Sequence, residues 1–223
     1  MTQLQKNSST YPLLSIARHR MGTDGTGVTT LVAGAGCPLH CKWCINRQLL
    51  QDAPSKETTP QELLDLVMID DLYFRASGGG ITFGGGESLL HADFIREFRN
   101  ICPSQWKINA ETSLYVPRNY LAAITDCVDL FIVDCKDMNA EIYAEYTGGD
   151  CAVMEENLKF LLERVGPEKV IVRVPLIPEY NTKADQENSA EKLKKIGVTG
   201  LDLFEYVIRE SLSESPSEMG KMK

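Results

Sequence analysis

The feature that most constrains the fold of this chain is a repeated alternation of short apolar segments with longer amphipathic ones. The apolar segments favour β-strands and occur six times: Val28–Ala33, Gly80–Phe83, Lys107–Ala110, Leu130–Asp134, Val170–Val174 and Leu201–Tyr206. Continuous apolar strands that alternate with helices are typical of a parallel sheet covered by helices. We therefore predict an α/β fold built from about six βα units.

Helical segments lie between these strands. The clearest one begins at Thr59, where Thr59 as N-cap, Pro60 at the first helical position and Glu62 match a capping box. Four apolar residues continue this helix at helical spacing: Leu63, Leu64, Val67 and Leu72. The other predicted helices are Ala92–Ile101, Pro117–Ile124, Ala140–Tyr146, Met154–Arg164 and Ala184–Lys195.

The number of units favours one barrel architecture. A complete eight-unit barrel takes about 250 residues, and this chain has 223. Six units in this length suggest a partial, open (β/α)6 barrel. A doubly wound open sheet is the competing architecture, and the pattern alone does not separate the two. We expect a single domain over residues 1–210 and a polar, disordered tail over residues 211–223.

Composition excludes several functional classes. The net charge of −8 argues against nucleic acid or an anionic membrane as the main partner. No apolar run reaches the roughly 18 residues of a membrane span, and the N-terminal segment MTQLQKNSSTYP lacks the apolar region of a signal peptide. We therefore expect a cytoplasmic protein, whose seven cysteines are ligands or buried thiols rather than disulfides.

Three cysteines stand together directly after the first predicted strand. They are Cys37, Cys41 and Cys44, with the spacing CxxxCxxC, so that three thiolates can meet at one inorganic centre. A closed zinc site wants four ligands, with His40 as a candidate fourth. A 4Fe–4S cluster held by only three cysteines keeps one iron open for a substrate or cofactor. The other four cysteines are scattered along the chain and are interpreted as small buried hydrophobic residues: Cys102, Cys127, Cys135 and Cys151.

Acidic residues and glycines follow the predicted strands. Glu87, Glu111 and Asp134 lie at or just past the carboxyl ends of successive strands, where the catalytic loops of barrel enzymes converge. Each alone could be a solvated loop acid, but three in succession favour a site. The residues just before Glu87 are Gly84, Gly85 and Gly86. Glycines let the backbone approach a ligand closely.

Three segments together resemble a known family. The cysteine motif, with Trp43 before its last cysteine, resembles the signature of the radical S-adenosylmethionine (SAM) superfamily. The narrower resemblance is to the activating enzymes of glycyl radical enzymes, and it rests on Asp24–Gly27 (DGTG), on Cys37–Asn46 and on Ser77–Glu87 (SGGGITFGGGE). It runs from about Ile16 to about Val207 and implies a partial barrel of the radical SAM type.

The resemblance implies a role for each motif. The three clustered cysteines would hold a 4Fe–4S cluster, and Asp24–Gly27 would lie near the peptide substrate. The residues expected to contact SAM are Trp43, Gly84, Gly85, Gly86, Glu87, Lys136 and Arg173. For Arg173 a structural ion pair is the alternative. A monovalent cation beside the SAM carboxylate would take Glu111, Thr112, Asp134 and the Ile132 carbonyl as ligands. The family has Asp where this chain has Glu111, and His where it has Val207.

The resemblance also implies an activity and partners. A monomeric, anaerobic enzyme, reduced by flavodoxin or ferredoxin, would cleave SAM reductively to a 5′-deoxyadenosyl radical. That radical would take a hydrogen atom from a glycine of a partner glycyl radical enzyme. One alternative is a radical SAM enzyme that acts on a small molecule or a ribosomal peptide. Another, from a different class, is a non-catalytic module that binds zinc or an iron–sulfur centre.

Overall fold

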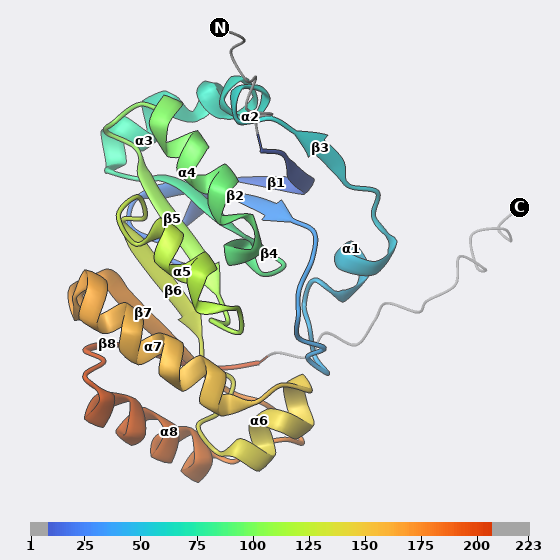
Figure 1. Ribbon diagram of the computed structural model, residues 1–223, viewed down its shortest axis with the longest axis vertical. Helices are drawn as coiled ribbons and strands as arrows, with labels where there is room; N and C mark the ends of the chain where they lie inside the picture. Colours follow the sequence, from blue (N-terminus) through green and yellow to red (C-terminus); the bar gives the residue numbers. More distant parts are fainter. Residues whose placement is uncertain (1–8, 207–223) are drawn as a thin grey trace, which may run out of the picture.

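The computed structural model describes residues 9–206 and contains one eight-stranded sheet (Figure 1). The strand order is β3-β1-β2-β4-β5-β6-β7-β8. Neighbours from β2 to β8 are parallel, whereas β1 pairs antiparallel with both β2 and β3. The strands are β1 Tyr11–Met21, β2 Val28–Gly34, β3 Lys56–Thr58, β4 Gly80–Gly85, β5 Lys107–Thr112, β6 Leu130–Asp134, β7 Val170–Leu176 and β8 Gly200–Glu205.

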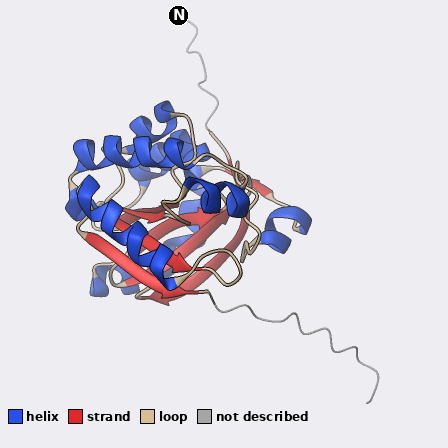
Figure 2. Ribbon diagram, turned by 90° about the horizontal axis from the view of Figure 1, so that it is seen from below, coloured by secondary structure: helices blue, strands red, loops and turns tan. Residues whose placement is uncertain are grey.

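The parallel strands follow one another across the sheet in chain order. A doubly wound sheet reverses its order at a switch point, but here each strand from β4 to β8 is added beside its predecessor. Figure 2 shows the strands as one layer, with most of the helices on one side of it. The six predicted strands are therefore confirmed as the parallel part of an open (β/α)6 barrel, and the doubly wound alternative is wrong.

The helices are α1 Arg47–Asp52, α2 Pro60–Val67, α3 Asp71–Ser77, α4 Ala92–Ile101, α5 Arg118–Ile124, α6 Ala140–Thr147, α7 Cys151–Val165 and α8 Lys183–Ile196. Six helices, α2 and α4 to α8, lie close to their predicted positions, whereas α1 and α3 were not predicted. The capping box is present at α2, because the Thr59 hydroxyl accepts from the Glu62 amide while the Glu62 carboxylate accepts from the Thr59 amide. Leu72 departs from prediction: it is 73% exposed. A 3-10 turn at Met68–Asp70 ends the helical face, and buried Asp70 anchors that turn by accepting from Thr30.

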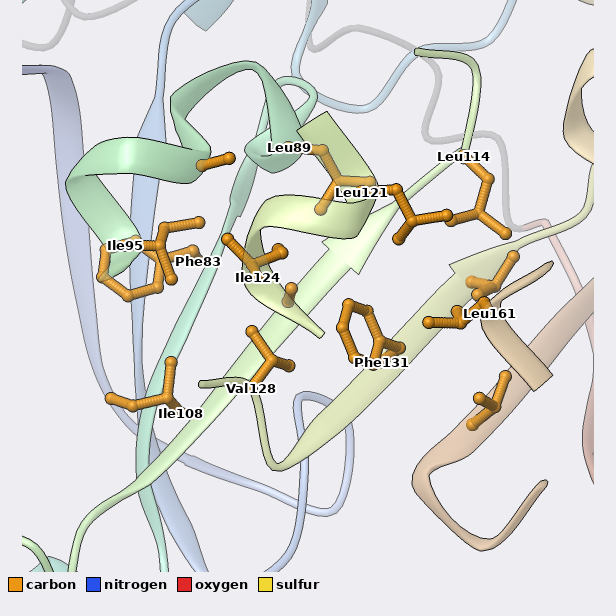
Figure 3. Close-up of a cluster of buried hydrophobic side chains, with 14 of the residues drawn as sticks. Phe83, Leu89, Ile95, Ile108, Leu114, Leu121, Ile124, Val128, Phe131 and Leu161 are labelled. Carbon is orange, nitrogen blue, oxygen red and sulfur yellow. The ribbon is translucent and has the colours of Figure 1, made fainter. Parts of the chain in front are cut away.

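The two faces of the sheet differ in chemistry. Successive side chains of a strand point to opposite faces. The outer face is apolar, and Figure 3 shows Phe83, Ile108 and Phe131 packed with side chains from α4, α5 and α7 such as Ile95, Ile124 and Leu161. The inner face carries polar residues at the intervening positions of β4 to β7: Thr82, Asn109, Glu111, Asp134 and Arg173. The polar inner face is where a site can form.

Two strands and two helices lie outside the predicted alternation, namely β1, β3, α1 and α3. Both extra strands extend the sheet at its β2 edge. The predicted tail over residues 211–223 and the departure at Val207 lie outside the described residues. In the part of the chain that the structure describes, no helix has the length and apolar character needed to span a membrane.

Candidate functional site

The cysteine loop joins β2 to α1 at the carboxyl end of β2 (Figure 1). It carries Cys37, Cys41 and Cys44, all half-buried and none in a disulfide. Its backbone is fixed to the end of α6, because the His40 amide donates to the Thr147 carbonyl at 2.8 Å and the Lys42 amide donates to the Tyr146 carbonyl at 3.0 Å. The Arg47 guanidinium donates to two carbonyls within the loop, at 2.9 and 2.6 Å. The loop is thus held by backbone contacts that leave its thiols available.

The thiols fit an iron–sulfur cluster better than a single metal ion. Burial raises the pKa of Cys37 to about 11 and also raises that of Cys41, so both would lose their protons on binding a metal centre. A closed zinc site takes four ligands, whereas this loop supplies three thiolates. A 4Fe–4S cluster binds each thiolate at a different iron, so three thiols on one loop suit it.

The glycine segment lies beside the cysteine loop, where β4 ends. Its residues are Gly84, Gly85 and Gly86. The amides of Gly86 and Glu87 donate to carbonyls of the β2 end and the cysteine loop, at 3.0 and 2.8 Å, and the Gly85 carbonyl accepts from Asn46 at 2.8 Å. A Cβ atom on Gly86 would collide with the neighbouring backbone, and one on Gly84 would lie 2.6 Å from the Glu111 carboxylate. The close approach of these segments therefore requires glycine.

The Glu87 side chain points into the protein interior rather than toward the inner face. It is 2% exposed, and its carboxylate accepts four hydrogen bonds. The donors are the Thr112 hydroxyl (2.7 Å), the Ser113 amide and hydroxyl (2.8 and 2.6 Å) and the Leu89 amide (3.1 Å). Burial raises the pKa of Glu87, although hydrogen bonds from Ser113 and Thr112 oppose the rise. This carboxylate ties the β4 and β5 loops together.

A row of charges crosses the inner face at the carboxyl ends of β5, β6 and β7. Arg173 donates to Glu111 at 2.9 Å and lies 3.9 Å from Asp134. The Lys136 ammonium donates to Asp134 at 3.1 Å and to the hydroxyl of Tyr206 at 3.0 Å. We call these five residues the charged row. Both cations are largely buried. Lys136 lies near the cysteine loop, because its charge opposes the rise in the pKa of Cys41, whereas Arg173 also donates to the Thr23 carbonyl.

Burial and pairing act in opposite directions on the pKa values of this row. Burial raises the pKa of Glu111 to about 7, and Arg173 opposes the rise. Burial lowers the pKa of Lys136, but Asp134 and Tyr206 raise it more, so the ammonium stays charged. The row therefore keeps two positively charged side chains on the inner face, each beside a carboxylate.

The predicted cation ligands are only partly brought together. Glu111 and Asp134 share the inner face and both lie near Arg173. Thr112 follows Glu111 in β5 and so faces the other side of the sheet, where its hydroxyl bonds Glu87. The Thr112 side chain is thus directed away from the two carboxylates.

The loop between β1 and β2 lies against the same inner face. The Asp24 carbonyl accepts from the Thr82 hydroxyl and from the Asn109 amide group, and the Thr23 carbonyl accepts from Arg173. A Cβ atom on Gly25 would collide with Asn109. The DGTG segment is therefore packed on β4 and β5, and the preceding Thr23 is bonded to β7.

Trp43 lies on the cysteine loop and is 37% exposed, so its indole is available to a ligand or partner. Two residues of the site were not predicted. Asn46 holds the glycine segment, and its signal was its place two residues after the last clustered cysteine. Tyr206 holds Lys136, and its only signal was its position at the end of the last strand.

Comparisons with known proteins place this geometry in a family. The family model described as the Radical SAM superfamily matches residues 31–201. The chain is 34% identical to a pyruvate formate-lyase-activating enzyme of Clostridium pasteurianum, over 78% of this chain and 71% of that protein. It is 28% identical to a choline trimethylamine-lyase activating enzyme of Oleidesulfovibrio alaskensis, over 87% of this chain and 83% of that protein.

A solved structure supports the fold. The crystal structure of Streptococcus suis SuiB bound to S-adenosylmethionine matches with a TM-score of 0.61 at 11% identity, over 78% of this chain and 39% of that chain. The sequence relatives and the matched region from β2 to β8 together show the family. This chain belongs to the radical SAM superfamily, among the activating enzymes of glycyl radical enzymes.

Proposed function

We propose that this protein generates a 5′-deoxyadenosyl radical from SAM and uses it to take a hydrogen atom from a glycine Cα of a partner glycyl radical enzyme. The observation that carries this proposal is the loop of three free thiols at the carboxyl end of β2, beside the glycine segment and the charged row. Its relatives are activating enzymes of this kind. The cofactors are a 4Fe–4S cluster and SAM.

Each part of the site has a distinct task in this proposal. Cys37, Cys41 and Cys44 hold the cluster and leave one iron free. When bound, the reduced cluster and SAM supply the radical by reductive cleavage of a C–S bond. The backbone of Gly84–Gly86 receives the SAM amino group, and Glu87 shapes that backbone from the interior. Lys136, which lies near Cys41, and Arg173, which lies beside Asp134 on the same inner face, attract the SAM carboxylate.

The surroundings of the site suit a protein partner. Trp43 is available for contact with the cofactor or the partner, and the packed DGTG segment lines the inner face that a glycine-bearing loop would enter. The net charge of −8 argues against nucleic acid as the main partner, which agrees with a protein partner. We propose flavodoxin or ferredoxin as the reductant, and a monomer in the cytoplasm as the acting form.

An anaerobic assay tests this function. The chain is reconstituted with iron and sulfide, reduced with dithionite and given SAM, and 5′-deoxyadenosine is measured. Candidate glycyl radical enzymes are then added, and the glycyl radical doublet is recorded by electron paramagnetic resonance. Cys41→Ala is expected to lose both cluster absorbance and turnover. Cys127→Ala is the matched control, because Cys127 is half-buried and far along the chain from the loop.

The outcomes separate three hypotheses: an activating enzyme, a radical SAM enzyme with another substrate, and a non-catalytic module. Absence of 5′-deoxyadenosine would refute any radical SAM activity and leave a metal-binding module. Its formation without a glycyl radical on any partner would favour an enzyme that acts on a small molecule or a ribosomal peptide. An active Cys41→Ala variant would refute the ligand assignment.

A further inference from the structure

We propose that Arg173 and Lys136 take the place of an inorganic monovalent cation at the carboxylates of Glu111 and Asp134, so that this chain binds SAM without potassium or sodium. The proposal rests on the proposed function. It concerns the neighbourhood of the SAM carboxylate, where the resemblance alone implies a cation held by the side chains of residues 111, 112 and 134 and by the Ile132 carbonyl.

The two carboxylates already have cationic partners. Arg173 lies 2.9 Å from Glu111 and 3.9 Å from Asp134, so one guanidinium is placed between both acids. The Lys136 ammonium lies 3.1 Å from Asp134 on its other side. A metal ion placed between the acids would stand in contact with these two charges and be repelled by them.

The third implied ligand is turned away. The Thr112 hydroxyl donates to Glu87 at 2.7 Å and accepts from the Leu114 amide at 2.8 Å, so its hydrogen-bonding capacity is largely used on the outer side of the sheet. Register places Thr112 opposite Val133 of β6, whereas Glu111 is opposite Ile132. A monovalent cation needs several oxygen ligands around one point, and here the three side chains lie on two faces.

Charges within the inner face also balance without an ion. Three carboxylates belong to Asp24, Glu111 and Asp134, and each has a basic side chain as partner. These basic side chains are Arg20, Arg173 and Lys136. No uncompensated acid among the described residues of this row calls for a further positive charge.

The length of Glu111 explains why the guanidinium fits here. Glu111 stands on β5 and Arg173 on β7, with β6 between them. Neighbouring strands are about 4.8 Å apart, so the two side chains must together span about two such spacings. Aspartate at position 111 would end one methylene short of Arg173. We therefore assign the replacement of the cation to the extra methylene of Glu111.

Binding measurements in different salts test this inference. The reconstituted, oxidised holoenzyme cannot cleave SAM, so equilibrium dialysis with radiolabelled SAM gives its dissociation constant directly. The constant is measured in potassium, sodium and tetramethylammonium chloride at equal ionic strength, because tetramethylammonium is too large for an oxygen-lined ion site. The wild-type constant is expected to vary by less than about twofold. Glu111→Asp is expected to bind about tenfold more weakly in tetramethylammonium than in potassium.

The matched control is Glu163→Asp, the same change at an exposed position of α7, which is expected to be indifferent to the cation. Weaker wild-type binding in tetramethylammonium would overturn the proposal while leaving the proposed function intact. A Glu111→Asp variant that stays indifferent would overturn the assignment to Glu111. No SAM binding in any salt would overturn both this proposal and the proposed function.

Discussion

Glu87 and Glu111 occupy similar places along the chain but lie in opposite environments. Glu87 lies just past the end of β4 and Glu111 near the end of β5, and these two strands are neighbours. Glu87 is buried among neutral donors from Thr112, Ser113 and Leu89. Glu111 lies on the inner face against the charged Arg173. One carboxylate therefore holds the protein together, while the other tunes the charge of the site.

The difference follows from strand geometry. Within β5, side chains alternate between the two faces, so Glu111 and Thr112 are separated although they are adjacent in sequence. Glu87 lies beyond the end of β4, after Gly85 with φ of +90°, where the alternation no longer applies. A carboxyl group at a strand end is thus not by itself a sign of a site.

The largest expected effect is on stability. Glu87→Ala leaves two hydroxyls and two amides without their acceptor, so we expect a loss of roughly 3–5 kcal/mol in the free energy of unfolding. Glu111→Ala leaves Arg173 beside its second partner, Asp134, so it should cost less, about 1–2 kcal/mol. Urea unfolding of the cluster-free proteins measures both. Equal losses would show that the two carboxylates do not differ as described.

The sequence allowed the fold to be predicted more fully than the site. The capping box at Thr59 and the bounds of Ala92–Ile101 are local signals, and both are confirmed. The strand β1 was missed because Arg18, His19 and Arg20 interrupt its apolar pattern and most of it is only half-buried. Half-buried strands next to a sheet edge lack the continuous apolar run of the central ones.

The site was predictable in its parts but not in its pairings. The motifs indicated which residues gather at the carboxyl edge. Which acid meets Arg173, and that Thr112 bonds Glu87, depends on the register between β5, β6 and β7. Register is a property of strand pairing between distant segments, and a single segment does not contain it.

The second prediction concerns Arg173, the charged partner of Glu111. Arg173→Leu removes a cation that we expect to meet the SAM carboxylate, so the dissociation constant of SAM should rise by about 30-fold to 100-fold. Arg96→Leu is the control, since Arg96 pairs with Asp126 on the exposed outer side, away from the charged row. Equilibrium dialysis with the oxidised holoenzyme measures both. An unchanged constant in Arg173→Leu would leave only the structural ion pair.

The third prediction is a pH dependence of stability. Burial raises the pKa of Glu111 to about 7, above its ordinary value of 4.5, so the folded state holds this proton more tightly than the unfolded state. The stability from the protonated form is complete below about pH 4.5 and is lost as pH rises through about 7. Wild type should therefore lose about 3 kcal/mol relative to Glu111→Gln across this window.

Urea unfolding of the two cluster-free proteins at a series of pH values measures this difference. Glu163→Gln, on the exposed face of α7, should follow the wild-type curve. If the difference between wild type and Glu111→Gln stayed constant with pH, Glu111 would be as solvated as an ordinary surface acid, and its contrast with surface residues would disappear.

The smallest expected effect separates orientation from charge within the row. Tyr206→Phe removes the hydroxyl that accepts from Lys136 but keeps the ring, which lies 5.7 Å from the ammonium. Lys136 keeps its charge and its bond to Asp134, so only the orientation of its ammonium group becomes less restricted. We expect SAM to bind about threefold to tenfold more weakly, because one hydrogen bond contributes about 1 kcal/mol.

The control for Tyr206 is Tyr120→Phe on α5, whose side chain is exposed. Urea unfolding of Tyr206→Phe should match wild type, because the removed hydroxyl lies beside an ammonium that keeps its carboxylate partner. A matched loss of stability and affinity would mean that Tyr206 acts as Glu87 does, by holding loops together. A loss of affinity alone would show that Tyr206 orients the Lys136 ammonium toward the SAM carboxylate. The inner face would then need neutral groups as well as charged ones.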